Sequence, residues 1–134
     1  MSYLLDTNIV SDLVRRQHTS PVRRRIQQVG QSAVCTSIIV AGELRYGVSK
    51  GGSAELRRRV PEILQSLTVL PIEEPVDTVY AELRARLEGA GQRLDGNDLL
   101  IAAQALALGH TLVTADRGFD RIAELPRENW LADD

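Results

Sequence analysis

Ser2-Tyr3-Leu4-Leu5-Asp6-Thr7-Asn8-Ile9-Val10 is the stretch that decides the fold. Its apolar beginning predicts a short buried strand over residues 2–5, and the helical spacing of apolar side chains from Ile9 onward predicts a helix over residues 7–16. Asp6 therefore lies at the carboxyl end of the strand, where open parallel sheets place their ligand crevices. Taken alone, Asp6 is also explained as the N-cap of the helix.

The rest of the chain repeats this alternation of strands and helices. Further helices are predicted over residues 21–29, 37–47, 54–66, 75–88 and 95–108, and further strands over residues 33–36, 68–72, 111–116 and 129–131. Crossovers of this length suit a parallel sheet, because a tight turn cannot join parallel strands. The order predicts an α/β fold, a three-layer α/β/α sandwich with a central, mostly parallel sheet.

The composition is that of an ordinary globular protein. Of the 134 residues, 43% are hydrophobic and 25% are charged, which predicts a single domain over residues 1–134. The chain has no basic leader followed by an apolar stretch and no apolar run of membrane-spanning length, so we expect a cytoplasmic protein without a membrane partner. The single cysteine, Cys35, is expected in the core, and disulfides and cysteine-ligated zinc are excluded.

Positive charge is clustered, although the formal net charge is -2. Arginines gather at residues 15–16, 23–25 and 57–59, and arginine can hold a phosphate group with two hydrogen bonds. The alternative is that these clusters are solvated faces of helices. Because the chain as a whole is not basic, its net charge does not indicate a nucleic-acid-binding protein.

Four acidic residues stand where predicted strands end or helices begin. Asp6 and Asp116 each end a strand, Asp98 lies in the first turn of a helix, and Glu43 lies on the helix that leaves the second strand. All four can therefore meet at one edge of the sheet. Local alternatives exist, namely a solvated surface position for Glu43 and a capping arrangement of Asp95 with Asp98.

Gathering acids without a counter-charge is costly. Two carboxylates about 5 Å apart repel each other by roughly 3 kcal/mol at an effective dielectric constant of about 20, and a divalent cation removes this cost. Oxygen ligands without cysteine or clustered histidine favour Mg²⁺ or Mn²⁺ over zinc. Such ions can activate water for in-line attack on a phosphodiester, which would leave 5'-phosphate and 3'-hydroxyl ends. Histidine chemistry has less support, because His18 and His110 lie in predicted connections.

Four groups of residues resemble the motifs of PIN-domain ribonucleases, in particular the VapC-type toxins of bacterial toxin-antitoxin pairs. The groups are Asp6-Thr7-Asn8, Glu43-Leu44-Arg45-Tyr46-Gly47, Asn97-Asp98-Leu99-Leu100-Ile101-Ala102-Ala103, and Thr114-Ala115-Asp116 with Phe119. Each is weak alone, whereas four in order over nearly the whole chain are a strong signal.

The resemblance implies an Mg²⁺- or Mn²⁺-dependent endoribonuclease that acts as the toxin of a type II toxin-antitoxin pair. It implies that the catalytic and metal-binding acids are Asp6, Glu43, Asp98 and Asp116. It implies supporting roles for Thr7, Asn8, Asn97 and Thr114. It also implies a homodimer, an RNA substrate, and a cognate antitoxin that blocks the acidic site. Two roles stay open for Asp116, which either ligates the metal directly or tunes the site from beside it.

Two other function classes remain as alternatives. A phosphotransferase or phosphatase can use a strand-terminal Asp as its nucleophile, but such enzymes commonly need a second acid two residues on, where this chain has Asn8. A binding module with the same fold and no activity is the other alternative. The presence of all four acids argues against such a loss of activity.

Overall fold

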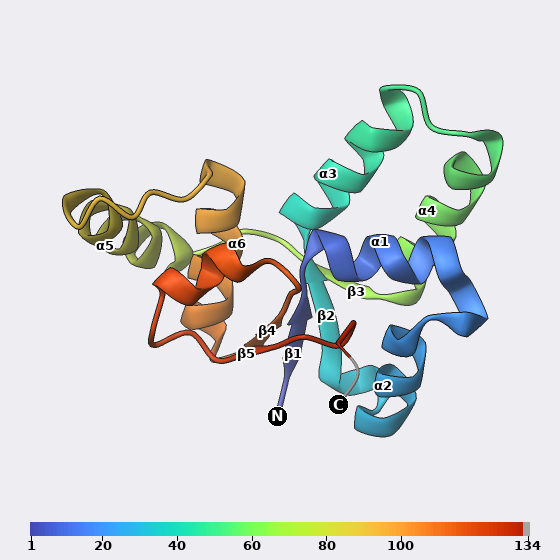
Figure 1. Cartoon of the computed structure of the whole chain (residues 1–134), viewed down its shortest axis with the longest axis horizontal. Helices are drawn as coiled ribbons and strands as arrows, with labels where there is room; N and C mark the ends of the chain where they lie inside the picture. The colour runs from blue at the N-terminus through green and yellow to red at the C-terminus, as the bar shows by residue number, and fades with distance from the viewer. Residues whose placement is uncertain (133–134) are drawn as a thin grey trace.

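The computed structural model describes residues 1 to 132, which form a five-stranded sheet with helices on both sides (Figure 1). The strands are β1 (Tyr3–Leu5), β2 (Val34–Ser37), β3 (Thr68–Leu70), β4 (Thr111–Val113) and β5 (Arg127–Glu128). Their order in the sheet is β3-β2-β1-β4-β5, and every pairing is parallel. The predicted α/β/α fold with a mostly parallel sheet is confirmed.

The helices begin where the sequence provides caps. They are α1 (Thr7–Arg16), α2 (Pro21–Val29), α3 (Ile38–Ser49), α4 (Ala54–Ser66), α5 (Val76–Gly89) and α6 (Gly96–Leu108). The side chains of Ser20, Ser37 and Ser53 each accept a hydrogen bond from a backbone N–H in the first turn of α2, α3 and α4. The predicted bounds of α1, α2 and α4 are confirmed.

The strand order explains which face of the sheet each helix covers. Right-handed crossovers from β1 to β2 and from β2 to β3 run in one direction and place α1 to α4 on one face. The return from β3 to β4 runs in the other direction and places α5 and α6 on the opposite face, as the two helix groups in Figure 1 show. The order of the strands therefore reverses between β1 and β4, and a ligand crevice is expected at their carboxyl ends.

The predicted position of the last strand, residues 129–131, is wrong, because the observed strand begins two residues earlier. The observed β5 is Arg127–Glu128, because the N–H of Thr114 donates to the carbonyl of Glu128 and so fixes the pairing register. The predicted third and fourth strands also extend past the observed ends of β3 and β4. Strand ends depend on partners across the sheet, which a local apolar pattern does not reveal.

The core is built on the three inner strands, β1, β2 and β4, whose residues are all buried. Cys35, on β2, is 7% exposed and is a core residue, as predicted. α6 contributes Ile101, Ala102 and Ala103 to the core, each without measurable exposure. Within residues 1 to 132, none of the helices combines the length and apolar content needed to cross a bilayer.

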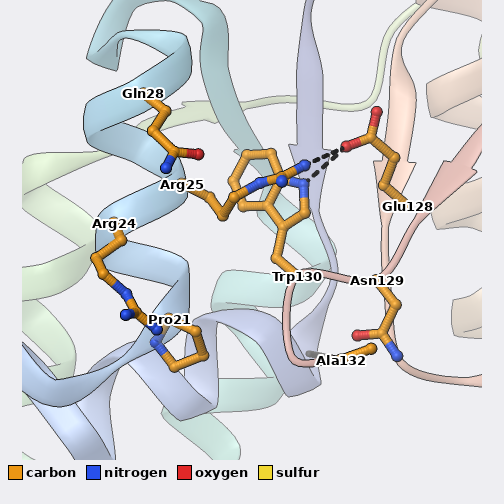
Figure 2. Close-up of a pocket in the computed structure, with 8 residues that line it drawn as sticks. All are labelled: Pro21, Arg24, Arg25, Gln28, Glu128, Asn129, Trp130 and Ala132. Carbon is orange, nitrogen blue, oxygen red and sulfur yellow. Dashed lines mark hydrogen bonds and ion pairs between the residues drawn. The ribbon is translucent and has the colours of Figure 1, made fainter. Parts of the chain in front are cut away.

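The Trp130 side chain packs the C-terminal segment against the rest of the molecule. Its side chain is 3% exposed, and its ring centroid lies 5.2 Å from that of Tyr3. Figure 2 shows the Arg25 guanidinium over the indole, 5.5 Å from the ring centroid. Arg25 and the indole N–H both donate to Oε1 of Glu128, at 3.0 and 2.9 Å. Trp130 is therefore a core residue.

Replacing Trp130 with alanine is expected to lower the free energy of unfolding by about 3–5 kcal/mol, because it leaves a cavity beneath Arg25 and Tyr3. Urea unfolding followed by circular dichroism measures this change. Trp130→Phe keeps most of the apolar contact and is the matched control, with an expected loss of about 1 kcal/mol. An alanine variant as stable as the parent would show that the segment is not part of the core.

Candidate active site

Asp6 lies between the end of β1 and the start of α1, and its residue exposure is only 3%. Its Oδ1 accepts the backbone N–H of Thr7 at 2.8 Å. Its Oδ2 accepts the hydroxyl of Thr114 at 2.7 Å and the amide of Asn8 at 3.5 Å. Asp6 is thus the N-cap of α1, but capping uses only one of its oxygens. The other oxygen joins a polar cluster at the end of β4.

Asn8 and Thr114 connect the carboxyl ends of β1 and β4. The side-chain carbonyl of Asn8 accepts the backbone N–H of Ala115 at 3.1 Å. The Thr114 hydroxyl donates to Asp6 and accepts the N–H of Asp116 at 3.0 Å. Thr114 is 5% exposed, so its hydrogen bonds are shielded from water. Both residues act on the position of Asp6.

Thr7 brings Glu43 to the same place from a different helix. The Thr7 hydroxyl donates to Oε1 of Glu43 at 2.7 Å, across 36 positions of sequence. Glu43 is half-buried on α3. Thr7 therefore contacts two of the four predicted acids, Asp6 through its backbone N–H and Glu43 through its side chain.

Asp98 approaches from the opposite face of the sheet. It lies in the first turn of α6 and is half-buried. Asp95 caps this helix by accepting the N–H of Asn97 at 3.2 Å, so the predicted cap is present. The capping arrangement of Asp95 with Asp98 in the first turn is thus present, and it does not exclude a role for Asp98 beside the other acids.

Mutual repulsion marks the acids as one electrostatic unit. Burial raises the pKa of Asp98 to about 7, and the charges of Asp6, Asp95, Asp116 and Glu43 contribute to the increase, in that order. Burial also raises the pKa of Asp6, although its hydrogen bonds from Thr114 and from the Thr7 N–H oppose the shift. The charges of Glu43 and Asp116 add to this rise. Asp6 and Asp98 therefore both respond to the charges of neighbouring acids, as groups at one site do.

Asp116 is held differently from Asp6. It is exposed, and its Oδ1 accepts the N–H of Gly118 at 2.8 Å, which caps the short helix Arg117–Arg121. A Cβ atom at position 118 would lie 3.1 Å from this oxygen, so glycine gives the carboxylate its room. One Asp116 oxygen is occupied in this way. Both roles considered for Asp116 remain compatible with its geometry.

The acids fit a hydrated divalent cation in chemical type. Among residues 1 to 132, no three His, Cys, Asp or Glu side chains stand in an arrangement that could hold a metal ion by themselves. Mg²⁺ does not require such a cage, because it commonly keeps several waters and binds through one or two carboxylates. The oxygen donors of Asp6, Glu43 and Asp98, with their unrelieved repulsion, suit such an ion.

Two arginines of the sequence clusters, Arg16 and Arg25, have structural partners other than the four acids. No arginine is among the charges that shift the pKa values of Asp6 and Asp98. Arg16 instead pairs with Asp12 at 2.6 Å, and Arg25 is held by its contacts with the C-terminal segment. At these two positions arginine stabilises the fold.

A hollow of about 560 Å³ opens beside Glu43 and was not anticipated from the sequence. Thr7, Asn97 and Tyr46 line it together with Glu43. Asn97 thus lies at the edge of the site, facing this hollow. The sequence signal for Tyr46 was its helical spacing from Glu43, which places the two on one side of α3.

Comparisons with known proteins agree with this arrangement. The model of the PIN domain family matches residues 3–125. Ribonuclease VapC2 of Rickettsia felis is 36% identical over 132 residues, which are 97% of this chain and 98% of that protein. Toxin FitB of Neisseria gonorrhoeae is 32% identical over 122 residues, 86% of this chain and 88% of that protein.

Two solved structures also resemble the fold of this chain over nearly its whole length. The structure of VapBC2 from Rickettsia felis bound to a DNA fragment from their promoter gives a TM-score of 0.87 at 34% identity, and the match covers 97% of this chain and 99% of that one. VapBC-1 from nontypeable Haemophilus influenzae gives 0.85 at 28% identity, with coverage of 98% and 100%.

Fold and site together define an α/β protein with carboxylates gathered where the strand order reverses. The chain belongs to the PIN domain family, and its relatives in that family include the VapC ribonucleases. The family predicted from the four motifs is confirmed.

The metal-free protein should lose stability as the pH rises from about 4 to about 7. In this range folded Asp98 holds its proton up to a pKa of about 7, whereas in the unfolded chain it releases the proton near its ordinary value of 3.8. Asp98→Asn removes this penalty, and we expect its melting temperature in EDTA at pH 7.5 to exceed the parent's by roughly 3–5 °C. At pH 4 the difference should nearly vanish; an equal difference at both pH values would contradict the shift.

Proposed function

We propose that this protein is a Mg²⁺- or Mn²⁺-dependent endoribonuclease that acts as the toxin of a type II toxin-antitoxin pair. It would hydrolyse RNA phosphodiesters and leave 5'-phosphate and 3'-hydroxyl ends. The observation that best supports this proposal is the buried Asp6 carboxylate, which accepts a hydrogen bond from Thr114 at the end of β1. Asp6 interacts electrostatically with three further acids, at the point where the strand order reverses. Membership in a family that includes ribonucleases adds support.

In this proposal the four acids have different roles, which depend on how rigidly hydrogen bonds hold each carboxylate. Asp6 and Glu43 present oxygens whose orientation is fixed by Thr114 and Thr7, and Asp98 faces them from α6. When bound, the cation lowers the pKa of water and neutralises charge on the phosphate group. The carboxylates of Asp6, Glu43 and Asp98 would hold it, and Asp116 would ligate it or tune the site from beside it. Asn8 keeps the ends of β1 and β4 in register.

The proposed partners follow from the family. A cognate antitoxin that blocks the acidic site is supported by the similarity to VapBC2 from Rickettsia felis. It is further supported by VapBC-5 from Mycobacterium tuberculosis, described as a member of the VapBC family of toxin-antitoxin systems, at 25% identity and a TM-score of 0.69. We further propose that the chain is a single nuclease domain over residues 1–134, forms a homodimer and acts in the bacterial cytoplasm.

The two alternatives have less support from the geometry. A strand-terminal Asp nucleophile needs an unencumbered oxygen and an acid two positions on. Here both oxygens of Asp6 accept hydrogen bonds, and position 8 is an asparagine engaged with Ala115. A binding module without activity would gain nothing from Asp6 and Asp98, whose pKa values are raised by burial and by neighbouring negative charges.

Cleavage of a cellular RNA pool by the purified, antitoxin-free protein tests the proposal. We expect cutting with Mg²⁺ or Mn²⁺, none in EDTA, and product 5' ends that a 5'-phosphate-dependent exonuclease degrades. Asp6→Asn and Asp98→Asn should each slow cleavage at least about a hundredfold, because they remove charge that would hold the cation. Asp95→Asn is the matched control for the loss of one neighbouring charge, since asparagine caps a helix equally well and Asp95 acts on the site only through its charge on Asp98.

The same variants separate cation binding from turnover. Mn²⁺ should raise the melting temperature of the parent and of Asp95→Asn, because a ligand that binds only the folded state stabilises it. Asp98→Asn should show a smaller rise. Cutting that persists in EDTA, or equally with Asp98→Asn, would overturn the metal-dependent mechanism. RNA binding without cutting in the parent would favour the binding module.

A further inference from the structure

Beside the acids, the hollow of about 560 Å³ is open to solvent and lies between α3 and the start of α6. Ile38, Gly42 and Tyr46 line it from α3. Asn97 lines it from the first turn of α6, and Thr7 and Glu43 connect it to the acidic site through their 2.7 Å hydrogen bond. A group bound in this hollow would therefore lie next to Asp6 and Glu43.

The walls of this hollow expose apolar surface that folding does not explain. Tyr46 is 65% exposed and Ile38 is 48% exposed. They are two of only four large hydrophobic side chains in residues 1 to 132 with exposure of this size. A Cβ built on Gly42 meets no other atom within 4 Å, so the space above this glycine is open. An aromatic ring beside a glycine and an aliphatic side chain forms a flat, accessible surface.

The residues that line the hollow favour a flat, neutral ligand. Glu43 contributes negative charge and no arginine lines the hollow, so a phosphate group is disfavoured there. The Asn97 side chain has no hydrogen-bond partner within residues 1 to 132, and its amide can both donate and accept. The Lys50 Nζ atom lies over the Tyr46 ring, 5.8 Å from its centroid, in a cation–π contact. Unpaired nucleobases stack on tyrosine and present donors and acceptors at their edges.

We propose that this hollow is a nucleobase subsite, in which an unpaired base of the RNA next to the cleaved phosphodiester stacks on Tyr46. The base packs between Tyr46, Ile38 and the open face of Gly42, and the Asn97 amide contacts its edge. Tyr46 and Asn97 would then determine which sequences are cut. This inference rests on the proposed ribonuclease function, because it identifies the hollow by its continuity with the acids.

Helix α3 offers a matched pair of glycines for the test. Gly42 lines the hollow, whereas Gly47 is exposed one turn later on the same helix and lies outside it. Neither glycine has a positive φ, and a Cβ at either position meets no other atom within 4 Å. Leucine is therefore compatible with the backbone at both positions and favours the helix. Gly42→Leu fills the hollow, and Gly47→Leu makes the same change without filling it.

Binding is measured in EDTA by fluorescence anisotropy with labelled single-stranded rA6, rC6 and rU6 and with an abasic ribose-phosphate hexamer. The parent should bind at least one base-containing hexamer about tenfold more tightly than the abasic hexamer, as expected for one stacked base. Tyr46→Ala and Gly42→Leu should reduce this preference about tenfold, and Asn97→Ala should reduce the differences among the three sequences. Tyr46→Phe, which keeps the ring, and Gly47→Leu should behave as the parent does.

The binding and cleavage measurements test the nucleobase subsite and the ribonuclease activity separately, because either can fail without the other. If the parent cuts RNA with Mg²⁺ but Tyr46→Ala and Gly42→Leu keep the parent's preference for bases, the subsite is wrong and the ribonuclease proposal stands. If these variants bind RNA as the parent does and instead change its sedimentation or its binding of an antitoxin, the hollow is a protein interface and the inference is overturned. Base-dependent binding without any cutting by the parent would support the subsite and contradict the activity.

Discussion

The structure depends on the burial of one charged group, the Asp6 carboxylate, at the junction of β1 and α1. A carboxylate that is 3% exposed loses most of its hydration, and it remains in place only because donors replace the lost water. The Thr7 N–H and the Thr114 hydroxyl supply these hydrogen bonds at 2.8 and 2.7 Å. The first starts a helix and the second joins β1 to β4. One side chain thus fixes both local structure and the position of the site.

Repulsion among the other acids works against this arrangement. Burial and neighbouring negative charges raise the pKa values of Asp6 and Asp98, so the site costs stability when both groups are ionised. The surrounding core can support this cost because β1, β2 and β4 are buried along their whole length and α6 packs against them. The cost is confined to the carboxyl ends of the strands, where few apolar contacts would be lost.

Sequence patterns predict most of this structure where the cause is local. The end of β1 and the start of α1 follow from an apolar run, an acid and helical spacing, all within residues 2–16. The meeting of Asp6 with Asp116 follows from topology, because the ends of parallel strands share one edge. The position of β5 could not be predicted, since two residues carry too little pattern and their register is set by β4. The hydrogen bond from the Thr7 hydroxyl to the Glu43 carboxylate could not be predicted from the sequence either, because it depends on how α1 packs beside α3.

The contrast between Asp6 and Asp116 shows how position within the site limits chemistry. Asp6 is buried and has hydrogen bonds to both of its oxygens, so its geometry changes little when a substrate arrives. Asp116 is exposed, and only its Oδ1 is engaged, by the Gly118 N–H. Its other oxygen can still turn toward an incoming cation or water. A rigid acid suits the fixed part of a coordination shell, whereas an adjustable one suits a role that changes during turnover. Both proposed roles of Asp116, metal ligand and tuning group, would use this adjustable oxygen, whereas Asp6 is held by both of its oxygens.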